Sequence, residues 1–150
     1  MAHDEQTFDF DFFLVGAGQA NVPLGPKLIQ DGHRVGLAER EHMGGSCVNF
    51  GCMPSKAVHA SARVAHQARL AKDWGIDIDS AAVRPVLKDV LARARVWSSK
   101  AEQHITSEYA KQGIKVFAAH ARLAGRHGDG FRIALDDNAA GQTVTARQVV

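Results

Sequence analysis

An apolar stretch that ends in a pair of glycines is the feature that most constrains the fold of this chain. The sequence is continuously apolar over residues 13–15, and Gly16-Ala17-Gly18 follows directly. A short apolar run stopped by glycine is typical of a strand buried on both faces of a parallel sheet. A helix is expected over residues 19–30 and a second strand over residues 34–38. Residues 8–39 are therefore predicted to form one strand–helix–strand unit, which indicates the α/β class.

The glycine turn has the form of a dinucleotide-binding motif. Gly16 permits a tight turn, Gly18 lets the backbone approach a pyrophosphate, and the following helix presents free N–H groups to it. Glu39 ends the second strand at about the 20-residue spacing expected of a carboxylate that binds ribose. Asn21 replaces the third glycine of the motif, and we expect it to weaken cofactor binding. The alternative is a turn that binds nothing.

Two cysteines lie in a second glycine-rich segment, Gly44-Gly45-Ser46-Cys47-Val48-Asn49-Phe50-Gly51-Cys52-Met53-Pro54-Ser55-Lys56. Their spacing fits neither a thioredoxin-type pair nor a zinc ribbon. A regular helix would hold their Cα atoms further apart than the about 7 Å that a disulfide allows, so a bond between them needs a distorted backbone. Two unpaired cysteines or a metal site remain as alternatives. No four-ligand spacing is present, and we predict no metal.

Length and composition exclude several other classes of protein. The 150 residues carry a formal net charge of +2, and 45% are hydrophobic, which fits one ordinary globular domain. No run approaches the roughly 20 apolar residues that cross a bilayer, so no membrane partner is expected. The basic residues form no stripe, which argues against nucleic acid. Without a signal-peptide pattern, and with cysteines that would cycle, the cytoplasm is the expected location.

The rest of the chain predicts two further helices, a strand and a β-ribbon. The helices are expected over residues 55–72 and from a cap at Ser80 to Gly113, with Trp97 and Tyr109 packed on the apolar face of the second. The strand is expected over residues 114–118, and the ribbon over residues 131–135 and 143–150. The sequence stops within an apolar strand pattern, from which we expect an incomplete domain.

Together these motifs resemble the flavin-dependent pyridine nucleotide–disulfide oxidoreductases, which include dihydrolipoamide dehydrogenase, glutathione reductase and mercuric reductase. The resemblance rests on Gly16-Ala17-Gly18 with Glu39 and on residues 44–56, and residues 60–66 look most like the mercuric reductase branch. It implies a Rossmann-like FAD-binding domain with a parallel sheet, helices and a small β-ribbon. Residues 8–150 would be the N-terminal part of that domain, behind a disordered leader at residues 1–7.

The resemblance also implies which residues bind FAD. The glycine turn and its neighbours would hold the pyrophosphate, Glu39 the adenosine ribose, and the backbone at Ala121 the adenine end. The expected cofactor-binding residues are Gly16, Ala17, Gly18, Gln19, Ala20, Glu39, Arg40, Gly45, Ser46, Lys56 and Ala121.

The implied reaction runs through a redox-active disulfide between Cys47 and Cys52. Hydride would pass from NAD(P)H to FAD, and electrons from FAD to the disulfide, with Cys52 against the flavin. Cys47 would then deliver the electrons to a disulfide or metal-ion acceptor. In the full-length protein the resemblance implies a homodimer. These 150 residues contain no second glycine motif for NAD(P)H, so we expect them to be inactive alone. The competing hypothesis is a non-catalytic nucleotide-binding or thiol-redox module.

Overall fold

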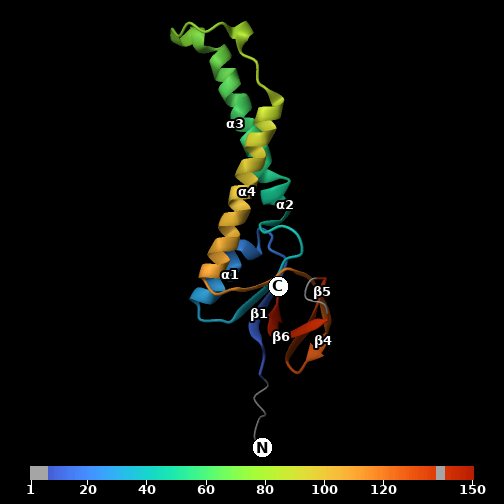
Figure 1. Ribbon diagram of the computed structural model, residues 1–150. Helices are drawn as coiled ribbons and strands as arrows, with labels where there is room; N and C mark the ends of the chain where they lie inside the picture. The colour runs from blue at the N-terminus through green and yellow to red at the C-terminus, as the bar shows by residue number, and fades with distance from the viewer. Residues whose placement is uncertain (1–6, 138–140) are drawn as a thin grey trace, which may run out of the picture. The chain divides into compact units, whose positions relative to one another are not determined.

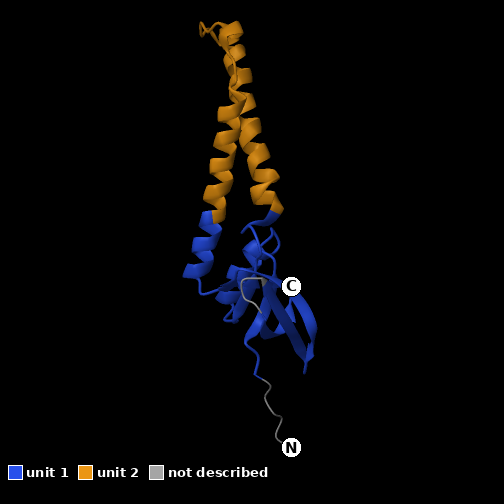
Figure 2. Ribbon diagram, turned by 45° about the vertical axis from the view of Figure 1, so that its right-hand side comes forward, with its two compact units in different colours: residues 1–45, 103–150 blue, residues 46–102 orange. Residues whose placement is uncertain are grey.

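The computed structural model describes residues 7–137 and 141–150, so residues 1–6 of the predicted leader lie outside it. The chain forms two compact units, shown in blue and orange in Figure 2. The first unit contains Met1–Gly45 and Gln103–Val150, and the second contains Ser46–Glu102.

A six-stranded mixed sheet forms the first unit, with the strand order β3-β2-β1-β6-β5-β4 (Figure 1). Strand β1 pairs in parallel with both β2 and β6, and β2 pairs in parallel with β3. Strand β5 lies between β6 and β4 and runs antiparallel to both. The strands are β1 (Phe10–Val15), β2 (Val35–Ala38), β3 (Lys115–Phe117), β4 (Ala119–His127), β5 (Gly130–Asp137) and β6 (Gln142–Val149).

Strand β1 is buried on both faces, as its apolar sequence predicts. Phe13 and Leu14 have no exposed surface, and because successive side chains of a strand point to opposite faces, they belong to two different clusters. Helix α1 (Asn21–Gln30) connects β1 to β2. Gly25 lets this helix pack closely, since a Cβ there would lie 3.1 Å from the Ile114 side chain.

Two helices connected by short turns form most of the second unit. Helix α3 (Cys52–Arg69) follows the short helix α2 (Gly45–Asn49), and the 3-10 turns η1 (Ala71–Trp74) and η2 (Ser80–Ala82) lead to α4 (Leu87–Lys111). Within this unit the guanidinium of Arg93 on α4 donates a hydrogen bond to the Ala57 carbonyl on α3, at 2.9 Å. The last part of α4, from Gln103, belongs to the first unit.

The second predicted helix differs from its expectation in two ways. Ser80 does not cap it: Ser80 starts the turn η2, where the Asp79 carboxylate accepts from the Ala81 amide, and the helix begins only at Leu87. Tyr109 is buried as predicted, but Trp97 is 50% exposed. Ser98 is buried instead of Trp97, because the buried side chains of this part of the helix, Ala94 and Ser98, are four residues apart.

The predicted β-ribbon is larger than its sequence pattern indicates. Both expected strands form, but β4 adds a third strand over Ala119–His127, a segment that contains none of the β-branched residues and none of the Phe, Tyr or Trp residues that favour strands. Strand β6 also pairs in parallel with β1, so the ribbon continues the main sheet. The predicted α/β fold is therefore confirmed, with a mixed sheet.

Candidate nucleotide site and cysteine pair

The glycine turn between β1 and α1 is fixed by hydrogen bonds to two other segments of the first unit, the end of β2 and the second glycine pair. Gly16 has a φ of +87°, in the region that glycine favours, and its amide donates to the Ala38 carbonyl at 2.7 Å. The Ala17 amide donates to the Glu39 carboxylate at 2.8 Å, and the Ala17 carbonyl accepts from the Gly44 amide at 2.8 Å. The turn therefore has a defined shape before any ligand binds.

The same turn leaves backbone donors at the start of α1. The Gly18 carbonyl accepts from the amides of Asn21 and Val22, at 3.1 and 3.0 Å. The amides of Gly18, Gln19 and Ala20 find no acceptor in the part of the chain that the structure describes. Free amides at the start of a helix, combined with the helix dipole, favour an anion such as phosphate.

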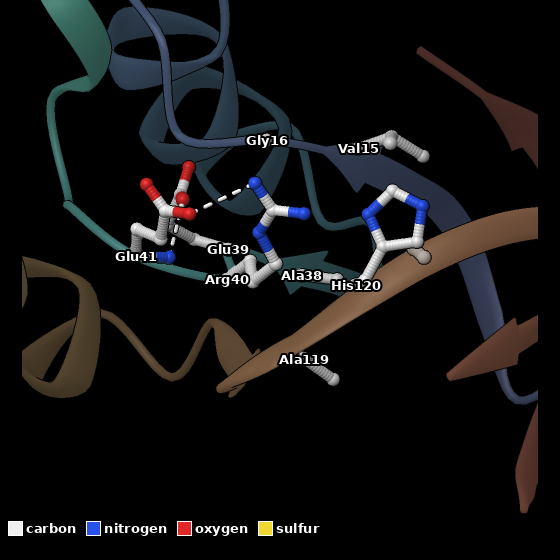
Figure 3. A pocket seen from close by; sticks show the side chains of 9 residues that line it. Val15, Gly16, Ala38, Glu39, Arg40, Glu41, Ala119 and His120 are labelled. Atoms are coloured by element: carbon white, nitrogen blue, oxygen red, sulfur yellow. Dashed lines mark hydrogen bonds and ion pairs between the residues drawn. The ribbon is translucent and has the colours of Figure 1, made fainter. Parts of the chain in front are cut away.

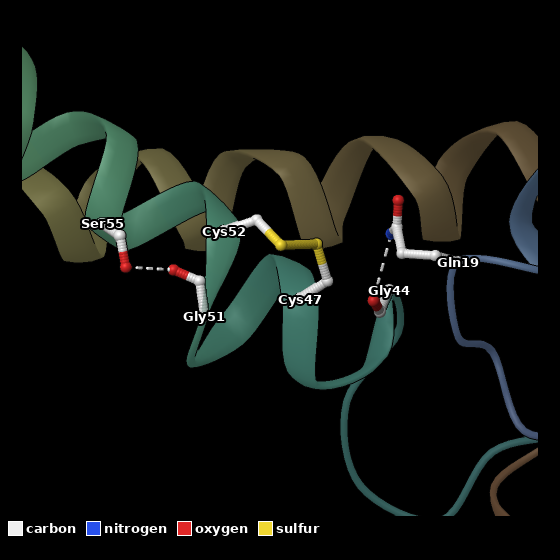
Figure 4. The surroundings of a disulfide bond; sticks show 6 residues. All are labelled: Gln19, Gly44, Cys47, Gly51, Cys52 and Ser55. Carbon is white, nitrogen blue, oxygen red and sulfur yellow. Dashed lines mark hydrogen bonds between the residues drawn. A yellow bond between two sulfur atoms is a disulfide. The ribbon is translucent and has the colours of Figure 1, made fainter.

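The second glycine pair lies against this turn. Gly44 and Gly45 both have positive φ angles, +93° and +62°. A Cβ at Gly45 would lie only 3.0 Å from the Gly18 Cα, and the side-chain amide of Gln19 donates to the Gly44 carbonyl at 3.3 Å (Figure 4). Two motifs that are separate in the sequence thus form one backbone cradle, in which a side chain at Gly45 would clash with the Gly18 backbone.

Glu39 is a brace as well as a candidate ribose ligand. One carboxylate oxygen accepts from Ala17, and the other accepts from the amides of Glu41 and His42, at 2.9 and 3.3 Å. Burial acts to raise the pKa of the Glu39 carboxyl. The hydrogen bonds from backbone amides, that of Ala17 first, outweigh burial and hold the pKa below its ordinary value of 4.5. Sequence reasoning missed this bracing role, because it depends on backbone groups.

Glu39→Gln is expected to lower the free energy of unfolding by about 1–2 kcal/mol at pH 7. The NH₂ group of the new side chain replaces one accepting oxygen, so it faces a backbone N–H group and cannot accept from it. The partial exposure of the side chain limits the loss. Since the pKa is lowered on folding, this contribution is present above pH 4.5 and disappears as the pH falls through the lowered pKa. Urea unfolding of both proteins across this range measures it. Glu41→Gln is the matched control, because the Glu41 carboxylate pairs with Arg40 at the surface. Equal losses in the two variants would contradict the bracing role.

A pocket of about 240 Å³ lies beside the turn, at the ends of β1 and β2 and the start of β4 (Figure 3). It brings together four predicted binding residues, namely Gly16, Glu39, Arg40 and Ala121. The side chain of His120, which was not predicted, also lines it. Pockets that enclose a whole small ligand usually measure roughly 300–1,000 Å³, so this one suits only part of a nucleotide.

The cysteines form a disulfide in the second unit. Cys47 lies in α2 and Cys52 begins α3, and their Cα atoms are 4.8 Å apart (Figure 4). Gly51 interrupts the helix between them with φ −125° and ψ −100°, which is the distortion that the spacing requires. A Cβ at Gly51 would lie 3.3 Å from the Ser46 carbonyl. Unpaired cysteines, the first alternative considered above, are therefore not what the structure contains.

The remaining predicted residues surround the cysteines in sequence. Ser46 and Lys56 belong to the second unit, and both are exposed. Cys52 is itself exposed, whereas Cys47 is partly buried. No described helix is long and apolar enough to cross a membrane.

A larger pocket, of about 490 Å³, lies elsewhere in the second unit. Its lining is uncharged, and consists of Gln67, Ala68, Leu70, Ala71, Trp74, Ile76 and Ile78. Such a lining offers a nucleotide no partner for its phosphates. The glycine turn and the smaller pocket are therefore the better candidate site.

Comparison with known proteins identifies the family. A model of the pyridine nucleotide-disulphide oxidoreductases matches residues 10–150. The chain belongs to this family. Its enzymes use FAD and NAD(P)H, as the resemblance implied. Dihydrolipoyl dehydrogenase of Rhizobium etli is 32% identical over 114 residues, which cover 76% of this chain and 24% of that protein. Dihydrolipoyl dehydrogenase of Chlamydia muridarum is 40% identical over 70 residues, covering 47% of this chain and 15% of that protein.

A solved structure supports the fold. The crystal structure of LpdA from Mycobacterium tuberculosis matches with a TM-score of 0.77 and 21% identity, over 92% of this chain and 30% of that one. The chain spans about a quarter of the length of the curated relatives that match most of it. These comparisons do not test the resemblance of residues 60–66 to mercuric reductase, which stays a prediction.

Proposed function

We propose that residues 8–150 are the FAD-binding and redox-disulfide portion of an oxidoreductase that passes electrons from NAD(P)H through FAD to the Cys47–Cys52 disulfide. The observation that carries the proposal is the backbone cradle, in which free amides at the start of α1 lie beside the close backbone approach of Gly45 to Gly18. A pyrophosphate needs both features, donors and close backbone approach. The residues present therefore fit the cofactor that the family uses.

The residues of the first unit would bind the adenosine diphosphate half of FAD. The amides of Gly18, Gln19 and Ala20 would donate to the phosphates, and Glu39 would accept from a ribose hydroxyl with a carboxylate that the backbone already orients. Arg40 and the Ala121 backbone would bound the adenine in the pocket.

The residues of the second unit would carry the thiol chemistry. When bound, FAD supplies the ability to accept hydride from NAD(P)H and to reduce a disulfide. Reduction of the Cys47–Cys52 bond by two electrons and two protons yields two thiols. Cys52 would face the flavin with Lys56 near it, and Cys47 as the thiolate would attack the acceptor.

The acceptor and the assembly are parts of the same proposal. A disulfide acceptor of the lipoamide type is favoured, because dihydrolipoyl dehydrogenases are among the relatives, with a metal ion as the alternative. We propose a homodimer for the full-length protein and a reducing cytoplasm as its location. These 150 residues carry no second dinucleotide motif, so we expect FAD binding without turnover.

Titration with FAD, ADP and riboflavin tests the proposal. We expect the purified chain to bind FAD and ADP, because both carry the diphosphate and adenosine that the first unit recognises, and to bind riboflavin far more weakly. Flavin fluorescence and isothermal calorimetry measure the affinities. Binding of neither FAD nor ADP would contradict the proposal. Binding of riboflavin alone would place recognition elsewhere in the chain.

A further inference from the structure

The residue that replaces the third glycine makes contacts that glycine cannot make. Asn21 is 6% exposed. Its side-chain nitrogen, Nδ2, donates to the Gly16 carbonyl at 2.9 Å and lies 3.4 Å from the Val15 carbonyl. Its own backbone carbonyl accepts from the Tyr109 hydroxyl at 2.9 Å. Asn21 thus joins the end of β1, the glycine turn and α4 within the first unit.

These contacts act on the peptide groups that shape the turn. The Gly16 amide is held by Ala38, and Asn21 holds the Gly16 carbonyl, so both polar groups of the residue with positive φ are fixed. Gly18, whose amide is a free donor, lies two residues later, and its carbonyl accepts from the Asn21 backbone. One residue therefore contacts both glycines of the motif.

The side-chain oxygen of Asn21, Oδ1, argues that this residue does more than fill space in the core. Oδ1 of Asn21 is buried and accepts no hydrogen bond from the described residues. A buried acceptor without a donor lowers stability, so an apolar side chain would serve packing alone better. What an apolar residue cannot supply is the donor to Gly16.

We propose that Asn21 is a positioning residue of the phosphate-binding turn: its side-chain amide fixes the Gly16 peptide so that the amides of Gly18, Gln19 and Ala20 stay directed at a diphosphate. The inference rests on the proposed function. It reverses the expectation drawn from the motif, in which Asn21 weakens binding. The turn of this chain depends on a side-chain donor where the motif has a bare glycine.

Asn21→Gly and Asn21→Ala both remove the donor, and they test the proposal with ADP as the probe. Chemical shifts of the Gly18, Gln19 and Ala20 amides follow the titration, under conditions where circular dichroism shows each variant folded. We expect both variants to bind ADP roughly ten-fold more weakly or worse, because a buried carbonyl loses its donor. Gln30→Gly, at the exposed end of the same helix, controls for the lower helix propensity of glycine.

A merely structural role would lower the stability of the variants and leave the ADP affinity of the folded molecules unchanged, and that result would overturn the inference. Tighter binding by Asn21→Gly would overturn it too. A wild-type chain that binds no ADP would instead contradict the proposed function, and the inference with it.

A second measurement tests the inference on the wild-type chain, in case the Asn21 variants do not fold. In the nucleotide-free wild-type chain, the side-chain NH₂ protons of Asn21 should exchange with water at least roughly ten-fold more slowly than those of the exposed Gln30, because one of them is held by Gly16. Equally fast exchange would overturn the inference without any variant.

Discussion

Saturating FAD is expected to slow the alkylation of Cys52 by roughly ten-fold or more while leaving Cys47 reactive, because a flavin over one sulfur blocks reagent access to it. Without the cofactor Cys52 is exposed and Cys47 is partly buried, so Cys52 should react first in the dithiol-reduced chain. The order of reactivity therefore reverses when FAD binds. A change of order is a stronger result than a general slowing, which tightening of the fold alone would produce.

Mass spectrometry of the alkylated peptides measures the two rates in one sample, since both cysteines can be followed after digestion. ADP is the matched control, because it fills the nucleotide site without a flavin and should leave the order unchanged. The Cys47→Ser variant checks that the protected thiol is Cys52. Protection of Cys47 instead would reverse the two roles proposed for the cysteines, and equal protection by ADP would remove the flavin from the explanation.

Gly45→Ala should lower stability more than a methyl group added at Gly16 or Gly18, where a Cβ would meet no atom within 4 Å. The positive φ of +62° strains any side chain, and the new Cβ would lie 3.0 Å from the Gly18 Cα, which is backbone and has little freedom to move. The two effects together are expected to lower the free energy of unfolding by about 2–4 kcal/mol. Since Gly18 shifts with the clash, ADP affinity should fall as well.

Gly113→Ala separates the cost of a side chain at positive φ from the cost of the clash with Gly18. Gly113 has a φ of +79°, similar to that of Gly45, but a Cβ there would meet no atom within 4 Å. This variant should lose only about 1–2 kcal/mol, the cost of the backbone conformation, with unchanged ADP affinity. Urea unfolding and ADP titration of both variants make the comparison. If Gly45→Ala behaves like Gly113→Ala in both measurements, the close approach of the two motifs is wrong.

The sequence predicted the parts of the fold and the site that depend on neighbours in the chain. The strand–turn–helix at Gly16 follows from local periodicity and from the turn chemistry of glycine. The break at Gly51 follows from the distance that the two cysteines must span. The pairing of β6 beside β1 was not predictable in this way, because residues such as Phe10 and Ala146 carry no local sign of their partner.

The contacts of single side chains were likewise not predictable where they involve residues distant in the sequence. Glu39 was predicted as a ribose ligand from its spacing, but its bonds to backbone amides depend on how the loop after β2 folds. Asn21 was predicted to weaken cofactor binding because the motif has glycine there, and its hydrogen bond to the Gly16 carbonyl has no sign in the local sequence. Trp97 was predicted to pack on the apolar face of its helix, but the buried positions there are Ala94 and Ser98, which are four residues apart.

The visible absorption spectrum of the FAD-loaded chain, cleared of free cofactor and recorded before and after dithiol reduction, tests whether electrons pass from FAD to the cysteine pair. We expect retained oxidised flavin that gains a long-wavelength charge-transfer band on reduction, because a thiolate at Cys52 would then lie against the flavin. The band should be absent in Cys52→Ser and should persist in Cys47→Ser. Retained flavin that shows no such band in the reduced wild-type chain would contradict the proposed path from FAD to the disulfide.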